Sequence, residues 1–67
     1  MKLNEIKEAV EQGKTVHWCN DLYTVIKDEK CNRFLIKCCE HYIGLTYQDG
    51  VTLNGKEEEF YLQNFNN

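Results

Sequence analysis

The sequence predicts an α+β fold, in which one N-terminal helix packs on a curved antiparallel sheet of four or five strands in meander order. Three observations lead to this prediction. Apolar residues recur every three or four positions up to Gln12, and from Thr15 onward they alternate with polar residues. Short turn-forming segments separate the alternating stretches, and short connections make successive strands antiparallel. A small, partly open barrel is the alternative architecture.

The helix is predicted over residues 3–12. Four residues with helical spacing form its apolar face: Leu3, Ile6, Ala9 and Val10. Asn4 is expected to cap its N-terminus, and Gly13 is expected to end it in a left-handed conformation. About ten residues of helix do not persist alone in water, so this face must pack on the sheet.

Five strands are predicted, and they cover residues 15–19, 22–26, 33–39, 42–47 and 60–62. Turns between them are expected at residues 20–21, 28–32 and 40–41. Gly44 within the fourth strand indicates a bulge or the close approach of another backbone. Asp49-Gly50 and Asn54-Gly55 are typical of two-residue hairpins. Residues 56–59 are expected to form a solvated loop.

The chain of 67 residues and 8.0 kDa is expected to form one domain, residues 1–67, with residues 63–67 frayed and Phe65 as their one candidate anchor. Ten residues are expected in the core: Leu3, Ile6, Val10, Val16, Trp18, Val25, Phe34, Ile36, Leu45 and Phe60.

Charge and composition exclude several classes of protein. Eleven acidic and eight basic residues give a net charge of −3, the wrong sign for neutralising phosphates, so no nucleic-acid partner is expected. Most of the excess acid lies from Glu40 onward, with five acidic residues against one Lys, and this half is a candidate surface for a basic partner. The sequence lacks a membrane-length apolar stretch and a signal peptide, so a cytoplasmic location without membrane contact is expected.

The four cysteines are interpreted mainly as reduced thiols packed like small apolar residues, with no cofactor. The alternative is a structural zinc site. His17 with Cys19, and Cys39 with His41, each place two ligand types two residues apart on one strand face. Two predicted strands separate these segments, and the usual paired-cysteine spacing of a zinc knuckle is missing.

Catalysis is not expected. The absence of Ser excludes a Ser nucleophile, and no oxyanion loop accompanies the Cys and His residues. The acidic residues Asp21, Asp28 and 57–59 match no metal-loop spacing and are interpreted as solvated charges.

Aromatic residues suggest a binding surface, because one helix covers only part of a sheet this wide. Tyr23, Tyr47 and Tyr61 are candidates for a partner-binding or self-association patch if they share the uncovered face; otherwise they form cross-strand pairs that stiffen the sheet. The second and third strands are apolar on both sides, which favours a homodimer through the uncovered face or an edge strand.

Five stretches carry a resemblance to known proteins: residues 5–18, 23–28, 43–46, 49–50 and 53–60. With them, nearly the whole chain resembles a group of short bacterial and phage proteins of unknown activity, so the resemblance implies no functional residue. The helix followed by Gly13-Lys14, Val16 and Trp18 is also similar to small phage proteins that sequester host signalling nucleotides.

A non-enzymatic binding or regulatory protein is therefore the main functional prediction, with an unknown protein or a second copy of the chain as its partner. The alternatives are a phage-encoded inhibitor, a nucleotide-sequestering protein and a zinc-stabilised domain.

Overall fold

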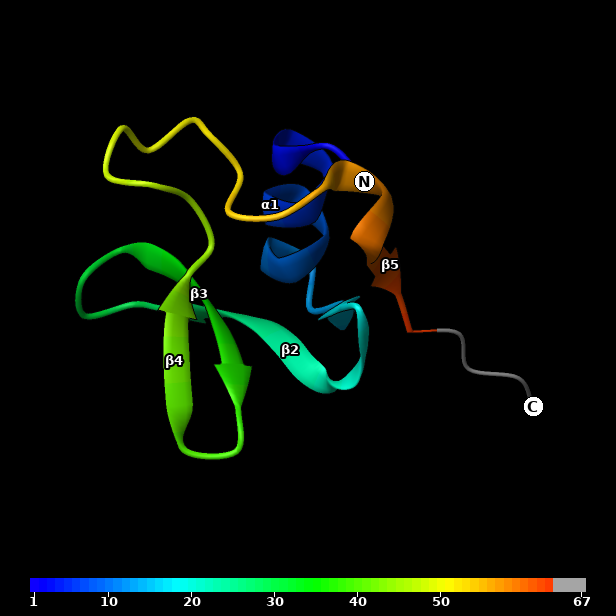
Figure 1. Cartoon of the computed structure of the whole chain (residues 1–67). Coiled ribbons are helices and arrows are strands. Elements are labelled where there is room, and N and C mark those ends of the chain that lie inside the picture. Colours follow the sequence, from blue (N-terminus) through cyan, green and yellow to red (C-terminus); the bar gives the residue numbers. More distant parts are fainter. Residues whose placement is uncertain (64–67) are drawn as a thin grey trace.

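A computed structural model describes residues 1–63 (Figure 1). In chain order its elements are α1 (Leu3–Glu11), β1 (Val16–Trp18), β2 (Asn20–Asp28), β3 (Arg33–Cys38), β4 (His41–Gly44), the 3-10 helix η1 (Glu57–Glu59) and β5 (Phe60–Leu62). The five strands form one antiparallel sheet in the order β4-β3-β2-β1-β5.

The sheet confirms the predicted α+β class and is not closed into a barrel. The first four strands follow one another as a meander, and β5 returns to pair with β1, where Trp18 lies opposite Phe60. Helix α1 packs mainly over β1 and β2 (Figure 1), so β3 and β4 extend beyond it. The strands β4 and β5 are the two edges of the sheet.

The helix begins at Leu3, as predicted, and ends before Gly13, but its N-terminal cap differs from the expected residue. Gly13 has a φ of +83°, its N–H donates to Val10 O, and the Lys14 N–H donates to Ala9 O at 2.9 Å. These bonds satisfy carbonyls that the last turn would leave free. At the other end Lys2, not Asn4, is the cap residue, because the Glu5 carboxylate accepts the Lys2 N–H at 2.8 Å.

The core lies between α1 and the sheet. Its buried apolar residues are Ile6, Ala9, Val16, Val25, Ile36, Leu45 and Phe60. Alternation along the strands explains this set, since Val16 pairs with Val25 and Val25 with Ile36 across neighbouring strands. Four residues predicted in the core are only partly buried at its margin: Leu3, Val10, Trp18 and Phe34. Ala9, on the predicted apolar face of the helix, and His17 are buried as well, although neither is among the ten residues expected in the core.

The fourth strand is shorter than predicted, because the chain turns away at Leu45 to follow its own loop. The Asn54 N–H donates to Leu45 O at 2.8 Å, and its side-chain amide donates to Gly44 O. Thr46 then forms an isolated bridge with Leu53. No bulge interrupts the β3–β4 ladder at Gly44; the backbone near it is that of its own segment two residues on, since a Cβ there would lie 3.2 Å from the backbone oxygen of Thr46.

Four turn and loop predictions need correction. The turn expected at residues 20–21 lies at Cys19, which has a φ of +66°, because Asn20 and Asp21 already belong to β2. Asp49-Gly50 lies at the tip of a closed loop, where the Asp49 carboxylate accepts the N–H groups of Val51 and Thr52, rather than joining two full strands. Asn54-Gly55 leads into η1, so the expected solvated loop at 56–59 is a 3-10 turn. The predicted bend at 40–41 lies at Cys39, which has a φ of +57°, and His41 already belongs to β4.

Of the residues expected to fray, Gln63 makes defined hydrogen bonds, and residues 64–67 lie outside the described part of the chain. The Gln63 N–H donates to Thr15 O at 2.8 Å, and the Gln63 side chain bonds to His17. The proposed anchor Phe65 lies outside the described residues.

The Trp18 indole is held by η1 and the sheet. Its ring lies edge-on to Tyr23 at 5.1 Å between centroids and stacks on Phe60, while Nε1 donates to Glu59 Oε1 at 3.2 Å. Glu59 also accepts the Lys56 N–H at 3.0 Å. These two donors, the Lys56 N–H first, hold the pKa of the Glu59 carboxyl below its usual value.

We expect the ionisation of this carboxylate to make the free energy of unfolding depend on pH. A lowered pKa in the folded state contributes stability that is fully present above the unfolded value of about 4.3 and is lost as the pH falls through the folded pKa. Urea midpoints measured between pH 7 and pH 2.5 should therefore fall below about pH 4.3. Glu59→Gln should flatten that fall.

The Asp49 carboxyl is a second source of acid dependence, because bonds from Thr52 and Val51 lower its pKa as well. The matched variant Asp49→Asn should remove its own share, and the double variant should flatten the profile most. An unchanged profile in Glu59→Gln would show that the Trp18–Glu59 contact does not depend on the charge.

Candidate binding surface

The face of the sheet opposite α1, here called the open sheet face, carries the candidate site. Side chains alternate along a strand, and Tyr23 and Val25 of β2 face the core. Leu22, Thr24 and Ile26 therefore point to the open sheet face, where register places Leu35 beside Ile26 and Lys37 beside Thr24. Leu22 is 69% exposed.

One half of the open sheet face is closed by polar contacts around His17. Although no helix of residues 1–63 covers this side, His17 is only 5% exposed. Its Nδ1 lies 3.0 Å from Tyr23 O and its Nε2 2.8 Å from Gln63 Oε1. The Tyr61 ring lies tilted over it at 5.5 Å. The Tyr61 hydroxyl donates to Asp21 at 2.7 Å, and this bond raises the pKa of Tyr61.

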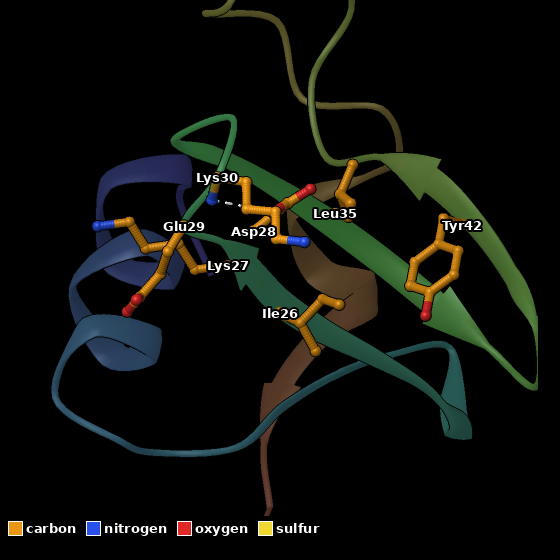
Figure 2. A pocket seen from close by; sticks show the side chains of 7 residues that line it. All are labelled: Ile26, Lys27, Asp28, Glu29, Lys30, Leu35 and Tyr42. Atoms are coloured by element: carbon orange, nitrogen blue, oxygen red, sulfur yellow. Dashed lines mark hydrogen bonds between the residues drawn. The ribbon is translucent and has the colours of Figure 1, made fainter.

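The other half is an open hollow, here called the sheet hollow. It has a volume of about 610 Å³ and is lined by Ile26, Lys27, Asp28, Glu29, Lys30, Leu35 and Tyr42. Figure 2 shows Ile26, Leu35 and Tyr42 on the three neighbouring strands β2, β3 and β4, with charged residues of the β2–β3 turn at one end. The floor is therefore apolar and the rim is charged.

The geometry of the rim is fixed by the turn. The Asp28 carboxylate accepts the Lys30 N–H at 3.1 Å (Figure 2). Lys27 is drawn toward the helix, where its Nζ lies 3.8 Å from Glu11 and 5.7 Å from the centre of the Phe34 ring. Tyr42 is 56% exposed, and Lys37 Nζ lies 6.0 Å from the centre of its ring. An apolar floor with a mixed rim suits the binding of a partner's apolar side chains.

The three tyrosines proposed as a patch do not share one surface. Tyr23 faces the core side and contacts Trp18, which contradicts the condition on which the patch depended. Tyr61 lies on the open sheet face, in its closed half, and Tyr47 lies in the loop after β4. The exposed tyrosine of the sheet hollow is instead Tyr42.

The four residues of the zinc alternative are not brought together. His17 lies in β1 and His41 in β4, and β2 and β3 run between them. Both ring nitrogens of His17 already have partners within the fold. Within residues 1–63, no three His, Cys, Asp or Glu side chains gather in a metal-binding arrangement.

The cysteines are less buried than expected. Cys19, Cys31 and Cys39 are exposed and Cys38 is half-buried, so the interpretation that the thiols pack like small apolar residues is wrong for the three exposed ones. Partial desolvation is the main reason that the pKa of Cys38 is raised, and the neighbouring Cys39 raises it further. Partial desolvation is also the main reason that the pKa of Cys19 is raised, and the negative charge of the Glu59 carboxylate raises it further. Both shifts favour the thiol over the thiolate, which is the nucleophile and the metal ligand.

Comparison with protein-family models, with curated proteins and with solved structures finds no match. The site is therefore assigned from its geometry. Among the described residues, no helix has the length and apolar character needed to cross a membrane.

The sheet hollow had a signal in the sequence. Apolar residues occupy both faces of the second and third strands. The register between β2 and β3 then places Ile26 beside Leu35 on the open sheet face. Tyr42 could not be added to them from the sequence, because the predicted fourth strand began at Tyr42 itself and its register with β3 was not known.

Proposed function

We propose that this chain is a small non-enzymatic binding protein, and that the sheet hollow takes up apolar side chains of a protein partner. The carrying observation is that Ile26, Leu35 and Tyr42 lie together on the open sheet face with no element of residues 1–63 covering them. Exposed apolar groups gathered in this way are typical of partner sites.

The chemistry of the lining supports binding rather than turnover. Among the seven residues that line the sheet hollow there is no His or Cys. The charged residues of the lining are two lysines and the two acidic residues Asp28 and Glu29. A mixed rim of this kind favours a protein partner over a polyanion, because its two lysines are matched in number by two carboxylates. Apolar contact then contributes most of the affinity, and the rim charges restrict the orientation.

The test compares two charge variants in capture experiments. Tagged wild-type protein is incubated with lysate of the source cell, and bound proteins and small molecules are identified by mass spectrometry. Ile26→Glu places a charge in the sheet hollow, whereas Val51→Glu places one on the distant loop, where Val51 is exposed. We expect one protein to be captured by the wild type and by Val51→Glu, and at least about tenfold less by Ile26→Glu.

Circular dichroism of both variants confirms that they are folded before capture. Equal capture of the partner by both variants would show that the binding surface lies outside the sheet hollow. A nucleotide recovered with the wild type, and a higher melting temperature when that nucleotide is added, would support the sequestering alternative instead.

A further inference from the structure

The outer side of β4 is an open sheet edge. In the β3–β4 ladder Ile36 lies opposite Ile43 and Cys38 opposite His41, and the next N–H, that of Leu45, donates to Phe34 O at 3.1 Å. Hydrogen-bonding direction alternates along an antiparallel strand, so His41 and Ile43 face β3. The N–H and C=O groups of Tyr42 and Gly44 therefore point outward, where Figure 1 shows no further strand.

Only the part of this edge around Tyr42 is available for pairing. The outward carbonyl of Gly44 accepts the Asn54 side-chain amide at 3.2 Å, and this contact closes the edge beyond Gly44. Strand β4 itself carries no Lys, Pro or bulge, which are the usual means of blocking an edge. Its side chains are instead apolar toward both faces, with Tyr42 56% and Ile43 39% exposed.

An edge centred on one residue fixes the register of a symmetric pair. Two antiparallel copies of β4 around a two-fold axis at Tyr42 place Tyr42 opposite Tyr42, and the outward N–H and C=O groups of both copies bond to each other. His41 then lies opposite Ile43 of the second copy on the side of α1. In the same register the turn residue Glu40 lies near Gly44 of the second copy, whose carbonyl stays bonded to Asn54.

Charge complementarity supports this register. Arg33 lies beside Gly44, since its guanidinium Nη2 is 4.0 Å from the position of a Cβ on Gly44. Glu40 of the second copy would arrive next to that guanidinium. Within residues 1–63 the ion pair between Lys27 and Glu11 is the one formed, so both Arg33 and Glu40 lack an ionic partner there. Symmetry produces two Arg33–Glu40 pairs across the axis.

We propose that the chain forms a homodimer through β4, with Tyr42 on the two-fold axis and Arg33 of each copy paired with Glu40 of the other. The dimer joins two five-stranded sheets into one continuous sheet of ten strands. Tyr42 also lines the sheet hollow, but the β4 contact uses its backbone groups and the Arg33–Glu40 pairs, so the proposal does not depend on the proposed function.

The test exchanges the charges at positions 33 and 40 and measures self-association by sedimentation equilibrium at up to 1 mM protein. The wild type should move from 8.0 kDa toward twice that mass. Arg33→Glu and Glu40→Arg should each weaken self-association at least about tenfold, because each variant alone faces two like-charge contacts. An equimolar mixture of the two variants should associate again, as should the double variant, since both restore opposite charges across the axis.

Amide hydrogen exchange locates the contact. The Tyr42 amide should exchange more slowly as the wild-type concentration rises, whereas the Val51 amide, in the loop and bonded to Asp49, should not change. A constant mass of 8.0 kDa up to 1 mM overturns the proposal. So does a wild-type dimer that both single variants form equally well, because such a dimer must use another surface.

Discussion

Gly55→Ala is expected to lower the free energy of unfolding by about 3 kcal/mol, because backbone strain and overlap add at this position. Gly55 has a φ of +148°, a region that only glycine occupies readily. A Cβ there would lie 2.8 Å from Trp18 Nε1 and 3.3 Å from the Phe60 ring. The indole cannot move away easily, since Glu59 and Tyr23 hold it.

The matched controls are Gly13→Ala and Gly50→Ala. Their φ angles are +83° and +74°, but a Cβ at either site would meet nothing within 4 Å. Strain alone should cost each of them about 1 kcal/mol. Urea unfolding followed by Trp18 fluorescence measures all three variants. A cost for Gly55→Ala equal to that of the controls would show that the Trp18 indole moves aside.

Ile36→Ala is expected to cost about 3 to 4 kcal/mol, which is most of the stability that a core of this size supplies. Ile36 is fully buried in β3 and lies between Val25 and Ile43 in the sheet. Removing its outer carbons leaves a cavity that the paired strands cannot close. The melting temperature should fall by more than about 12 °C in a domain of this length.

Ile26→Ala removes the same atoms from the opposite side of the sheet and is the matched control. Ile26 is half-buried on the open sheet face, so its truncation should cost only about 1 kcal/mol. Thermal melts of both variants at 20 µM and 500 µM make the comparison. A cost for Ile26→Ala that approaches that of Ile36→Ala, and grows with concentration, would mean that the open sheet face is covered in solution.

Local features of the fold could be predicted from the sequence, because their causes are local. Gly13 ends the helix because its own N–H bonds to Val10 O and the following N–H, that of Lys14, bonds to Ala9 O. Period-two alternation places Val16, Val25 and Ile36 on one face, and the structure buries all three. The β2–β3 and β3–β4 pairings follow from short turns.

The errors come from contacts between distant segments. His17 is buried because Tyr61 and Gln63, more than forty positions away, fold over it, and no pattern near His17 announces this. The fourth strand ends early because Asn54 takes the hydrogen bonds of Gly44 and Leu45. A two-sided apolar pattern could predict the sheet hollow, but the register that adds Tyr42 depends on the left-handed turn at Cys39.

The pairing of β5 with β1 determines the order in which the chain can fold. The hairpins β2–β3 and β3–β4 close over loops of a few residues, whereas Trp18 must meet Phe60 across most of the chain. Loop closure over such a separation is slow and follows the formation of nearby contacts. We expect the meander to form early in refolding and the Trp18 indole to reach its final environment last. Mutations around Trp18, Gly55 and Glu59 should then speed unfolding with little effect on the folding rate.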